Sequence, residues 1–251
     1  MNIKKTLTGV LMTAVFGYAG AGETLKLDSG NSRVALVELF TSEGCSSCPP
    51  ADRWMSQLKD DKRLWKQVVP VAFHVDYWDY IGWPDRFATP EYSERQKNHR
   101  RLGNVYSVYT PGFLVNGREW RGWFSQPELR VKAGEMPGRL TANYEDGLLE
   151  ASFTPSKPNG RYQLNFAVLG MSLSTQVDAG ENAGRELSHD FVVLDLQSWI
   201  LKPDSSGAHG ATQRVKFDRK DSKQIALAVW VSAPGSQVAL QAAGGLLSSA
   251  R

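Results

Sequence analysis

The chain has 251 residues, and its composition of 41% hydrophobic and 22% charged residues excludes a disordered, collagen-like or coiled-coil protein. Two cysteines exclude a small disulfide scaffold and any all-cysteine zinc or iron–sulfur site within one chain. The 29 basic residues nearly balance the 26 acidic ones, which predicts no nucleic-acid partner.

Residues 1–21 have the pattern of a secretory signal peptide. Lys4 and Lys5 form a positive start, residues 6–18 are apolar, and residues 19–21 supply small side chains for cleavage after Ala21. As a helix, the apolar run would rise only about 20 Å, which is short of the membrane's ~30 Å hydrocarbon core and argues against an anchor. We therefore expect a periplasmic or secreted protein with no membrane anchor after cleavage.

The first half of the mature chain alternates apolar runs with helical patterns. The runs that resemble buried strands are residues 34–40, 68–75 and 112–115, and the helical patterns cover residues 50–59 and 90–102. This alternation is typical of an α/β fold with a parallel or mixed sheet.

One turn and one stop signal predict how this half ends. Asn116-Gly117 separates two strand-like runs, and both residues suit the positive φ angles that a two-residue hairpin turn requires. Residues 127–133 have the pattern of a short closing helix, which Gly134 would end. We therefore expect the first domain to occupy residues 22–135.

After residue 138, short strand-like runs replace the helical patterns. They cover residues 140–144, 148–153, 162–169, 191–200, 213–217 and 225–231. Short strands separated by turn residues are typical of an antiparallel β-sandwich. We expect an all-β, sandwich-like domain over residues 139–251, with a mobile loop at residues 178–184.

The most specific motif is Cys45-Ser46-Ser47-Cys48, which lies between the first predicted strand and the first predicted helix. This order places both sulfurs at a helix N-terminus, where exposed N–H groups and the helix dipole favour the thiolate. Cys45 is placed to attack a partner disulfide, and Cys48, one turn later, to resolve the mixed disulfide. The motif predicts a redox-active pair.

A purely structural disulfide is the alternative for this pair. Closing a loop of four residues restricts the unfolded chain by only about 2 kcal/mol, whereas a long loop would give more than about 4 kcal/mol. A protein with two cysteines would gain more stability by placing them far apart. This comparison favours redox chemistry.

A polar and aromatic segment follows the second predicted strand. His74 lies at the end of that strand, and Asp76 and Trp78 follow it. Parallel strands bring their carboxyl ends to one edge of a sheet, so these side chains would lie near the cysteines. His74 and Asp76 are candidates for proton transfer, and Trp78 for an apolar rim of the substrate site. The alternative places His74 in the core and Trp78 at the domain edge.

The segment from Thr110 onward resembles the second half of a thioredoxin. Thr110-Pro111 precedes a strand, the Asn116-Gly117 turn, a further strand and a terminal helix. The resemblance implies that Pro111 is a cis-proline packed against the cysteines and that Thr110 offers backbone hydrogen bonds to a substrate peptide. It implies an α/β thioredoxin-like domain, here followed by the all-β domain.

A narrower resemblance is carried by residues 37–52, which read VELFTSEGCSSCPPAD. They are similar to a family of exported bacterial proteins catalogued as domain of unknown function twelve-twenty-three, in which a thioredoxin-like domain precedes a β-rich one. Residues 74–79, 110–112, 182–185 and 189–190 also resemble that family. The likeness therefore spans nearly the whole mature chain, although the family has no established reaction.

Several positions depart from the thioredoxin pattern. Gly44 replaces a tryptophan, which is expected to open the nucleophile to solvent, and Ser46-Ser47 replaces Gly-Pro, so the reduction potential cannot be transferred. Glu38 is the nearest equivalent of a buried acid beneath the resolving cysteine, although it lies seven rather than six residues before Cys45. As a buried acid, Glu38 would relay the proton of that cysteine, and its alternative is a solvated or salt-bridged strand residue.

The leading hypothesis is an exported thiol–disulfide oxidoreductase that uses no cofactor. Its partners would be protein thiols and disulfides and an unidentified redox protein. One alternative is a Cu(I)-binding protein or chaperone, with Cys45, Cys48 and His74 as soft ligands. Another is a binding module with an inert disulfide. His189 and Asp190 suggest a second site, but a polar strand start explains them more simply.

Overall fold

Sixteen strands and two α-helices form in the residues that this computed structural model describes, which are 22–125, 128–131, 134–157 and 160–249. The helices are α1 (Pro49–Gln57) and α2 (Pro90–Arg101), and the 3-10 turns are η1 (Leu58–Asp60), η2 (Asp79–Ile81), η3 (Gly122–Phe124) and η4 (Gly180–Asn182). The strands are β1 (Glu23–Asp28), β2 (Ala35–Thr41), β3 (Val68–His74), β4 (Gly112–Val115), β5 (Arg118–Glu119), β6 (Gly138–Glu145), β7 (Leu148–Pro155), β8 (Gln163–Met171), β9 (Leu173–Gln176), β10 (Glu186–His189), β11 (Val192–Ile200), β12 (Lys202–Pro203), β13 (His209–Arg214), β14 (Gln224–Ser232), β15 (Gln241–Leu246) and β16 (Ser248–Ser249). None of the described helices has the length and apolar character needed to cross a membrane.

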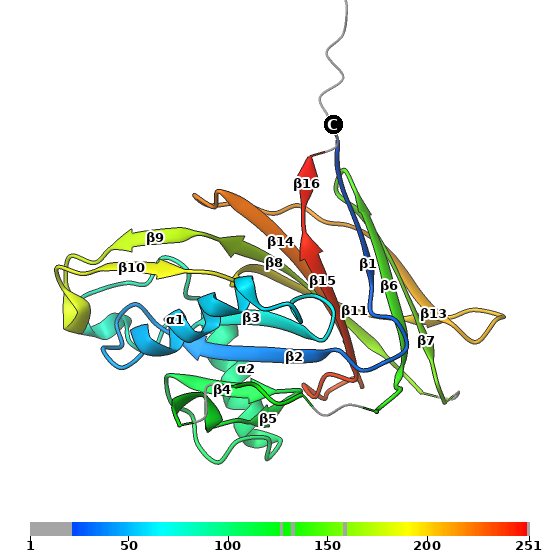
Figure 1. Cartoon of the computed structure of the whole chain (residues 1–251), viewed down its shortest axis with the longest axis horizontal. Helices are drawn as coiled ribbons and strands as arrows, with labels where there is room; N and C mark the ends of the chain where they lie inside the picture. The colour runs from blue at the N-terminus through cyan, green and yellow to red at the C-terminus, as the bar shows by residue number, and fades with distance from the viewer. Residues whose placement is uncertain (1–21, 126–127, 132–133, 158–159, 250–251) are drawn as a thin grey trace, which may run out of the picture.

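The strands form two large sheets and one separate hairpin. The eight-stranded sheet has the order β15-β14-β8-β11-β3-β2-β4-β5, and the six-stranded sheet has the order β12-β13-β7-β6-β1-β16. The hairpin pairs β9 with β10. Strand β3 is parallel to β2 and to β11, whereas the other ladders between described strands are antiparallel. Figure 1 shows the six-stranded sheet on the right, against one end of the eight-stranded sheet.

The eight-stranded sheet contributes to a core on each of its faces. In β8, Phe166 and Val168 belong to the core shared with the six-stranded sheet, whereas Ala167 and Leu169 belong to the core that includes the helices. Successive side chains of a strand point to opposite faces, so an uninterrupted apolar run fills both cores. The two packed sheets give the protein a β-sandwich-like fold.

Helices α1 and α2 cover opposite faces of β2. The Thr41 hydroxyl donates a hydrogen bond to Asp52 of α1 at 2.8 Å. The preceding residue, Phe40, points the other way and meets the ring of His99 in α2, with 5.9 Å between the ring centroids. Because the two helices cover both faces, every residue of β2 is buried.

The prediction of an α/β thioredoxin-like domain followed by an all-β domain is wrong. Strands dominate the described chain, and four strands that follow residue 138, namely β8, β11, β14 and β15, continue the same sheet as β2 and β3. The two halves of the chain are joined in this sheet by an unpredicted parallel pairing of Val192 in β11 with Ala72 in β3. The first strand, β1, also pairs with β6 in the six-stranded sheet. The proposed boundaries at residues 135 and 139 stay predictions.

The local predictions differ in their outcome. The strand at residues 112–115 is confirmed as β4, and Asn116 and Gly117 have the positive φ angles of 50° and 74° that the predicted turn requires. The closing helix at residues 127–133 is wrong for residues 128–131, which are not helical. Its remaining residues and the predicted signal peptide lie outside the described residues.

The core between the sheets provides a test of the sandwich packing. Ile225 lies in that core and is 1% exposed, whereas Ile200 is 47% exposed. Ile225→Val should reduce the free energy of unfolding by about 1 kcal/mol, because it removes one buried methylene without allowing the core to close. Urea denaturation measures the loss, and Ile200→Val is the matched control with little expected effect. Equal losses in the two variants would contradict the packing.

Candidate functional site

The two cysteines are joined by a disulfide bond directly before α1. Their Cα atoms lie 5.4 Å apart, and the predicted pairing is confirmed. The Cys48 carbonyl accepts hydrogen bonds from the N–H groups of Ala51 and Asp52, so Cys48 lies at the first turn of the helix. The Ser47 hydroxyl oxygen lies 3.3 Å from Cys45 Sγ. Both cysteines are 0% exposed, which closes the disulfide to solvent.

Trp78 connects the cysteine turn, defined as residues 42–48, to the loop before β4. Its indole N–H donates a hydrogen bond to the Thr110 hydroxyl at 2.8 Å. A Cβ at Gly44 would lie 3.1 Å from Cβ of Trp78, so only glycine allows this approach without displacement. Gly44 is buried, and the expectation that it opens the nucleophile to solvent is wrong. The Thr110–Pro111 peptide bond is cis, as the resemblance implied.

Five titratable side chains gather beside the cysteine turn, namely Glu43, Asp52, His74, Asp85 and His189 (the buried acid–histidine cluster). Each is at most 6% exposed. His74 Nδ1 lies 2.6 Å from Asp85 Oδ2, and His189 Nε2 lies 3.4 Å from Glu43 Oε1. The two histidine rings meet edge to face, with their centroids 4.9 Å apart. The small hollow lined by Asp52, His74 and His189 has no room for a water molecule.

Burial and charge pairing act in opposite directions on this cluster. Burial disfavours the imidazolium form of His74, but the carboxylates of Asp85, Asp52 and Glu43 outweigh it and raise the pKa of His74 to about 9. Burial also opposes the charge on Asp85, yet His74 holds the pKa of that carboxyl below its usual value. Burial raises the pKa of Asp52, although both histidines oppose the shift. Asp52 therefore keeps its proton to a higher pH than an exposed aspartate does.

A turn from the second half of the chain contacts the cysteine turn. Residues 180–185 (the 180–185 turn) connect β9 to β10, and Figure 1 shows them in yellow beside the loop that leads to α1. Asn182 Nδ2 donates hydrogen bonds to the carbonyls of Glu43 at 2.8 Å and Cys45 at 3.0 Å. The Ser46 N–H donates to Glu181 Oε2 at 3.0 Å. Asn182 is 0% exposed, and the mobile loop expected at residues 178–184 stays a prediction.

The sequence matches one family over most of its length. The family described as "Protein of unknown function (DUF1223)" matches residues 36–232, which include both cysteines, the buried acid–histidine cluster and the 180–185 turn. The chain belongs to this family. Among curated proteins, none matches the chain.

Two solved structures resemble this DUF1223 protein. One is a crystal structure of a protein from Agrobacterium tumefaciens with 26% identity, which covers 84% of this chain and 94% of that chain with a TM-score of 0.56. The other is HBP35 of Porphyromonas gingivalis with 17% identity, which covers 86% of this chain and 76% of that chain with a TM-score of 0.58. The likeness to HBP35 concerns the fold alone.

Glu38 lies on the face of β2 that α2 covers, whereas α1 covers the opposite face. Arg95 Nε donates to Glu38 Oε2 at 3.0 Å, and His99 Nε2 lies 3.4 Å from the same oxygen. Burial opposes the charge on Glu38, but Arg95 and His99 lower the pKa of the carboxyl to about 2. This placement does not support the predicted proton relay from Glu38 to Cys48. It matches the salt-bridged alternative, with the ion pair buried.

The predicted copper ligands are not gathered around a common point. Cys45 and Cys48 are joined to each other, and His74 Nδ1 contacts Asp85. In the part of the chain that the structure describes, no group of three or more His, Cys, Asp or Glu residues is placed to hold a metal ion. The copper hypothesis stays a prediction.

Sequence patterns do not indicate most of the polar residues around the disulfide. Asp52 could have been found, because it lies four residues after Cys48 and therefore one helical turn along α1. His189 was considered only for a second site, and it contacts Glu43 instead. Its neighbour Asp190 forms an ion pair with Lys59 Nζ at 2.7 Å. No spacing rule connects Asn182 to a turn that lies so far away in the sequence.

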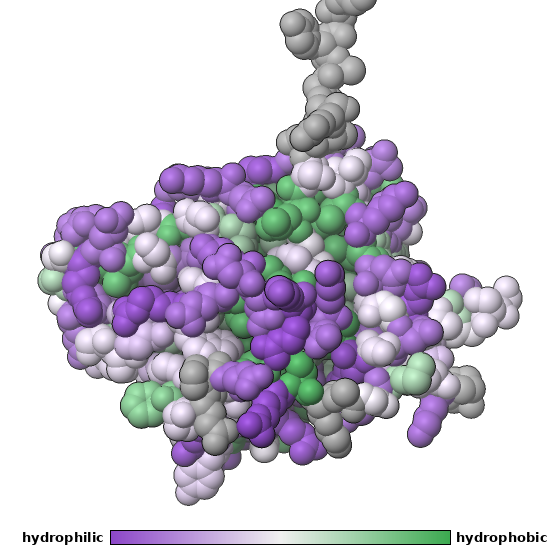
Figure 2. Space-filling model, in the orientation of Figure 1, coloured by the Kyte–Doolittle hydropathy of each residue, from purple (hydrophilic) through white to green (hydrophobic). Residues whose placement is uncertain are grey.

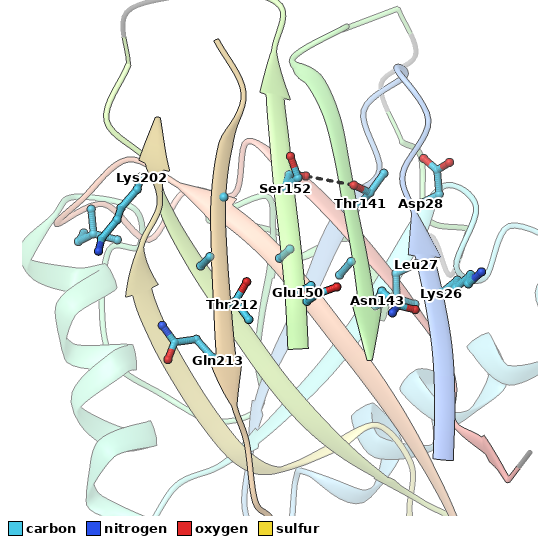
Figure 3. A pocket seen from close by; sticks show the side chains of 15 residues that line it. Lys26, Leu27, Asp28, Thr141, Asn143, Glu150, Ser152, Lys202, Thr212 and Gln213 are labelled. Atoms are coloured by element: carbon cyan, nitrogen blue, oxygen red, sulfur yellow. Dashed lines mark hydrogen bonds between the residues drawn. The ribbon is translucent and has the colours of Figure 1, made fainter. Parts of the chain in front are cut away.

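The larger pockets lie away from the disulfide. A pocket of about 680 Å³ lies over the six-stranded sheet, where Thr141 and Ser152 are joined by a hydrogen bond (Figure 3). A second pocket of about 880 Å³ lies between α2 and the eight-stranded sheet. Figure 2 shows that hydrophilic residues cover most of the face in view, with apolar residues near its middle. Neither pocket is lined by a cysteine, so the disulfide remains the candidate site.

Proposed function

We propose that this DUF1223 protein is a thiol–disulfide oxidoreductase that acts through Cys45 and Cys48 in the periplasm or outside the cell. The observation that carries the proposal is a disulfide placed directly before α1, with five buried titratable groups beside it. A bridge that closes four residues adds little stability, so its placement is better explained by chemistry. The signal-peptide pattern of residues 1–21 supports the proposed location.

The exchange takes two steps, here written for reduction of a partner disulfide. The Cys45 thiolate attacks one partner sulfur, which forms a mixed disulfide and releases the other partner sulfur as a thiolate. The Cys48 thiolate then attacks Cys45 Sγ, which restores the Cys45–Cys48 bond and releases the second partner thiolate. The partner gains two electrons and two protons, and the cysteine pair is oxidised. Oxidation of a partner dithiol is the same sequence in reverse.

The buried acid–histidine cluster would hold and return the protons of this cycle. Asp52 lies one helical turn after Cys48, and its backbone N–H donates a hydrogen bond to the Cys48 carbonyl at 3.1 Å. The raised pKa of Asp52 suits a group that must both take up and release a proton. Asp52 and His74 therefore replace Glu38 in this proposal.

Covalent trapping tests the proposed function. Cys48→Ser removes the group that resolves the mixed disulfide, so protein partners should accumulate on Cys45 and separate from it only under reducing conditions. Non-reducing gels and mass spectrometry of the captured species measure the outcome. The Cys45→Ser/Cys48→Ser double variant is the control and should trap nothing.

Two results would count against the function. One is a Cys48→Ser protein that captures no partner although it is folded. The other is a wild-type pair that stays oxidised in buffers poised below about −300 mV, which is typical of structural disulfides.

A further inference from the structure

The sulfur atoms of the disulfide are covered, whereas thiol–disulfide exchange requires direct access to one of them. A partner thiolate must reach a sulfur atom directly, yet Cys45 and Cys48 are both 0% exposed. The serines between them are exposed, so the cysteine turn lies at the surface while its sulfur atoms are covered. Some neighbouring segment has to move before any partner can react.

The 180–185 turn is one of the neighbours that hold the cysteine turn by hydrogen bonds, and it bonds on both sides of Cys45. Both hydrogens of the Asn182 amide group are used, one on the Glu43 carbonyl and one on the Cys45 carbonyl. Its oxygen accepts a hydrogen bond from Arg185 at 2.7 Å, which fixes the orientation of the amide. The Glu181 carboxylate accepts the Ser46 N–H and thereby contacts the residue that follows the first cysteine.

The hairpin that carries this turn lies outside the two large sheets, although its side chains Leu173, Leu187 and His189 are buried against the rest of the fold. Strands β9 and β10 pair only with each other among the described strands, and a two-stranded hairpin has little stability of its own. Gly180 packs beside η2, where an added Cβ would lie 3.3 Å from Cδ1 of Ile81. Local opening is therefore expected at the turn, where residues 181 and 183–185 are exposed, and not along the buried strands.

We propose that the 180–185 turn is a cap over the cysteine turn, and that Asn182 is the positioning residue that holds the cap closed. Partner thiols and disulfides reach Cys45 only after the Asn182 bonds to the Glu43 and Cys45 carbonyls have broken. The biological role of this cap rests on the proposed function, whereas its effect on access to the disulfide does not. A cap that covers both redox forms changes the rates of exchange in both directions equally and leaves the equilibrium unchanged.

The test compares full-length wild-type protein with Asn182→Ala. Two rates are measured, namely reduction of the disulfide by dithiothreitol and reoxidation of the dithiol by oxidised glutathione, together with the reduction potential in glutathione buffers. Loss of two hydrogen bonds from the closed form should raise both rates by about tenfold or more. The reduction potential should stay the same. If Asn182 instead stabilised one redox form, the potential would shift.

Two further variants make the result decisive. Glu186→Gln is the control, because Glu186 lies on the same hairpin but bonds to Ser174 across it, and both rates should match wild type. If Asn182→Ala fails to fold, Asn182→Asp keeps the size of the side chain and removes both donated hydrogen bonds, and it should show the same acceleration.

Two outcomes would overturn the cap, and a third would separate the cap from the proposed function. Rates within twofold of wild type in a folded Asn182 variant would overturn the cap. A shifted potential with one changed rate would also overturn it, since Asn182 would then stabilise one redox form. Acceleration in the Asn182 variants without any partner captured by Cys48→Ser would support the cap and reject the proposed function.

Discussion

Asp85→Asn is expected to destabilise the protein by about 3–5 kcal/mol at neutral pH, because it breaks a buried ion pair and leaves His74 without its partner. Asp85 Oδ2 contacts His74 Nδ1 and accepts the Glu43 N–H, while Oδ1 accepts the Phe87 N–H. An asparagine supplies one oxygen and one NH2 group. Whichever way it is turned, a donor then faces a donor at a side chain that is only 4% exposed.

The same variant should lose part of the pH dependence of stability. His74 has a folded pKa of about 9 and an unfolded value of about 6.5, so the folded state binds the proton more tightly. The contribution is present in full below about pH 6.5 and is lost as the pH rises towards 9. Wild-type stability should therefore fall across this window, and the fall should be smaller in Asp85→Asn.

Urea denaturation at a series of pH values between 6 and 9.5 (chosen to bracket both pKa values) measures both effects. Asp79→Asn is the matched control, because Asp79 Oδ1 accepts the Asp85 N–H and an asparagine oxygen can do the same. That variant should lose less than about 1 kcal/mol. A loss of similar size in both variants would show that the His74–Asp85 pair does not contribute more to the free energy of unfolding than an ordinary hydrogen bond.

Arg95→Met should also cost about 3–5 kcal/mol, because it leaves the Glu38 carboxylate buried without its cation. The Arg95 guanidinium donates two hydrogen bonds to Glu38 Oε2, and it also lies 5.0 Å from the ring centroid of Phe73. Methionine fills part of the space but offers no donor. The double variant Glu38→Gln/Arg95→Met removes the charge as well and should recover most of the loss.

The contribution of Glu38 to the free energy of unfolding should depend on pH in the acid range. The folded pKa of Glu38 is about 2, below the unfolded value of about 4.3, so its contribution is present above pH 4.3 and is lost as the pH falls towards 2. The deficit of Arg95→Met should therefore shrink at acid pH. Arg101→Met is the control on the same helix, since Arg101 is exposed and pairs with Glu94. It should lose less than about 1 kcal/mol, and a comparable loss would contradict the assignment.

Local patterns predicted individual elements better than they predicted the fold. The strand at residues 112–115 and the Asn116-Gly117 turn depend on side-chain alternation and backbone preference, which a short window contains. Strand β15, by contrast, reads QAAGGL and has none of the β-branched or aromatic residues typical of strands. It is a strand because it pairs with β14. Likewise, nothing local indicates that β11 adds to the edge of β3.

At the candidate site, the sequence predicted the cysteines and misplaced the acid. The resemblance matched Glu38 to the buried acid of thioredoxins. Glu38 lies seven residues before Cys45, whereas the thioredoxin acid lies six residues before the first cysteine. In a strand, a shift of one residue turns the side chain to the opposite face, and the structure places Glu38 against α2 accordingly. His189 and Asn182 could not be assigned, because tertiary pairing brings them to the cysteine turn.

The Asn182 contact also has a consequence for biosynthesis. Its partner Cys45 lies 137 residues earlier in the chain. Because the ribosome makes the chain from its N-terminus, Cys45 and Cys48 emerge before Asn182 can bond to the Cys45 carbonyl. An oxidising enzyme that meets the nascent protein during this interval finds two accessible thiols. The order of synthesis therefore lets the disulfide form before the Asn182 hydrogen bonds to the cysteine turn exist.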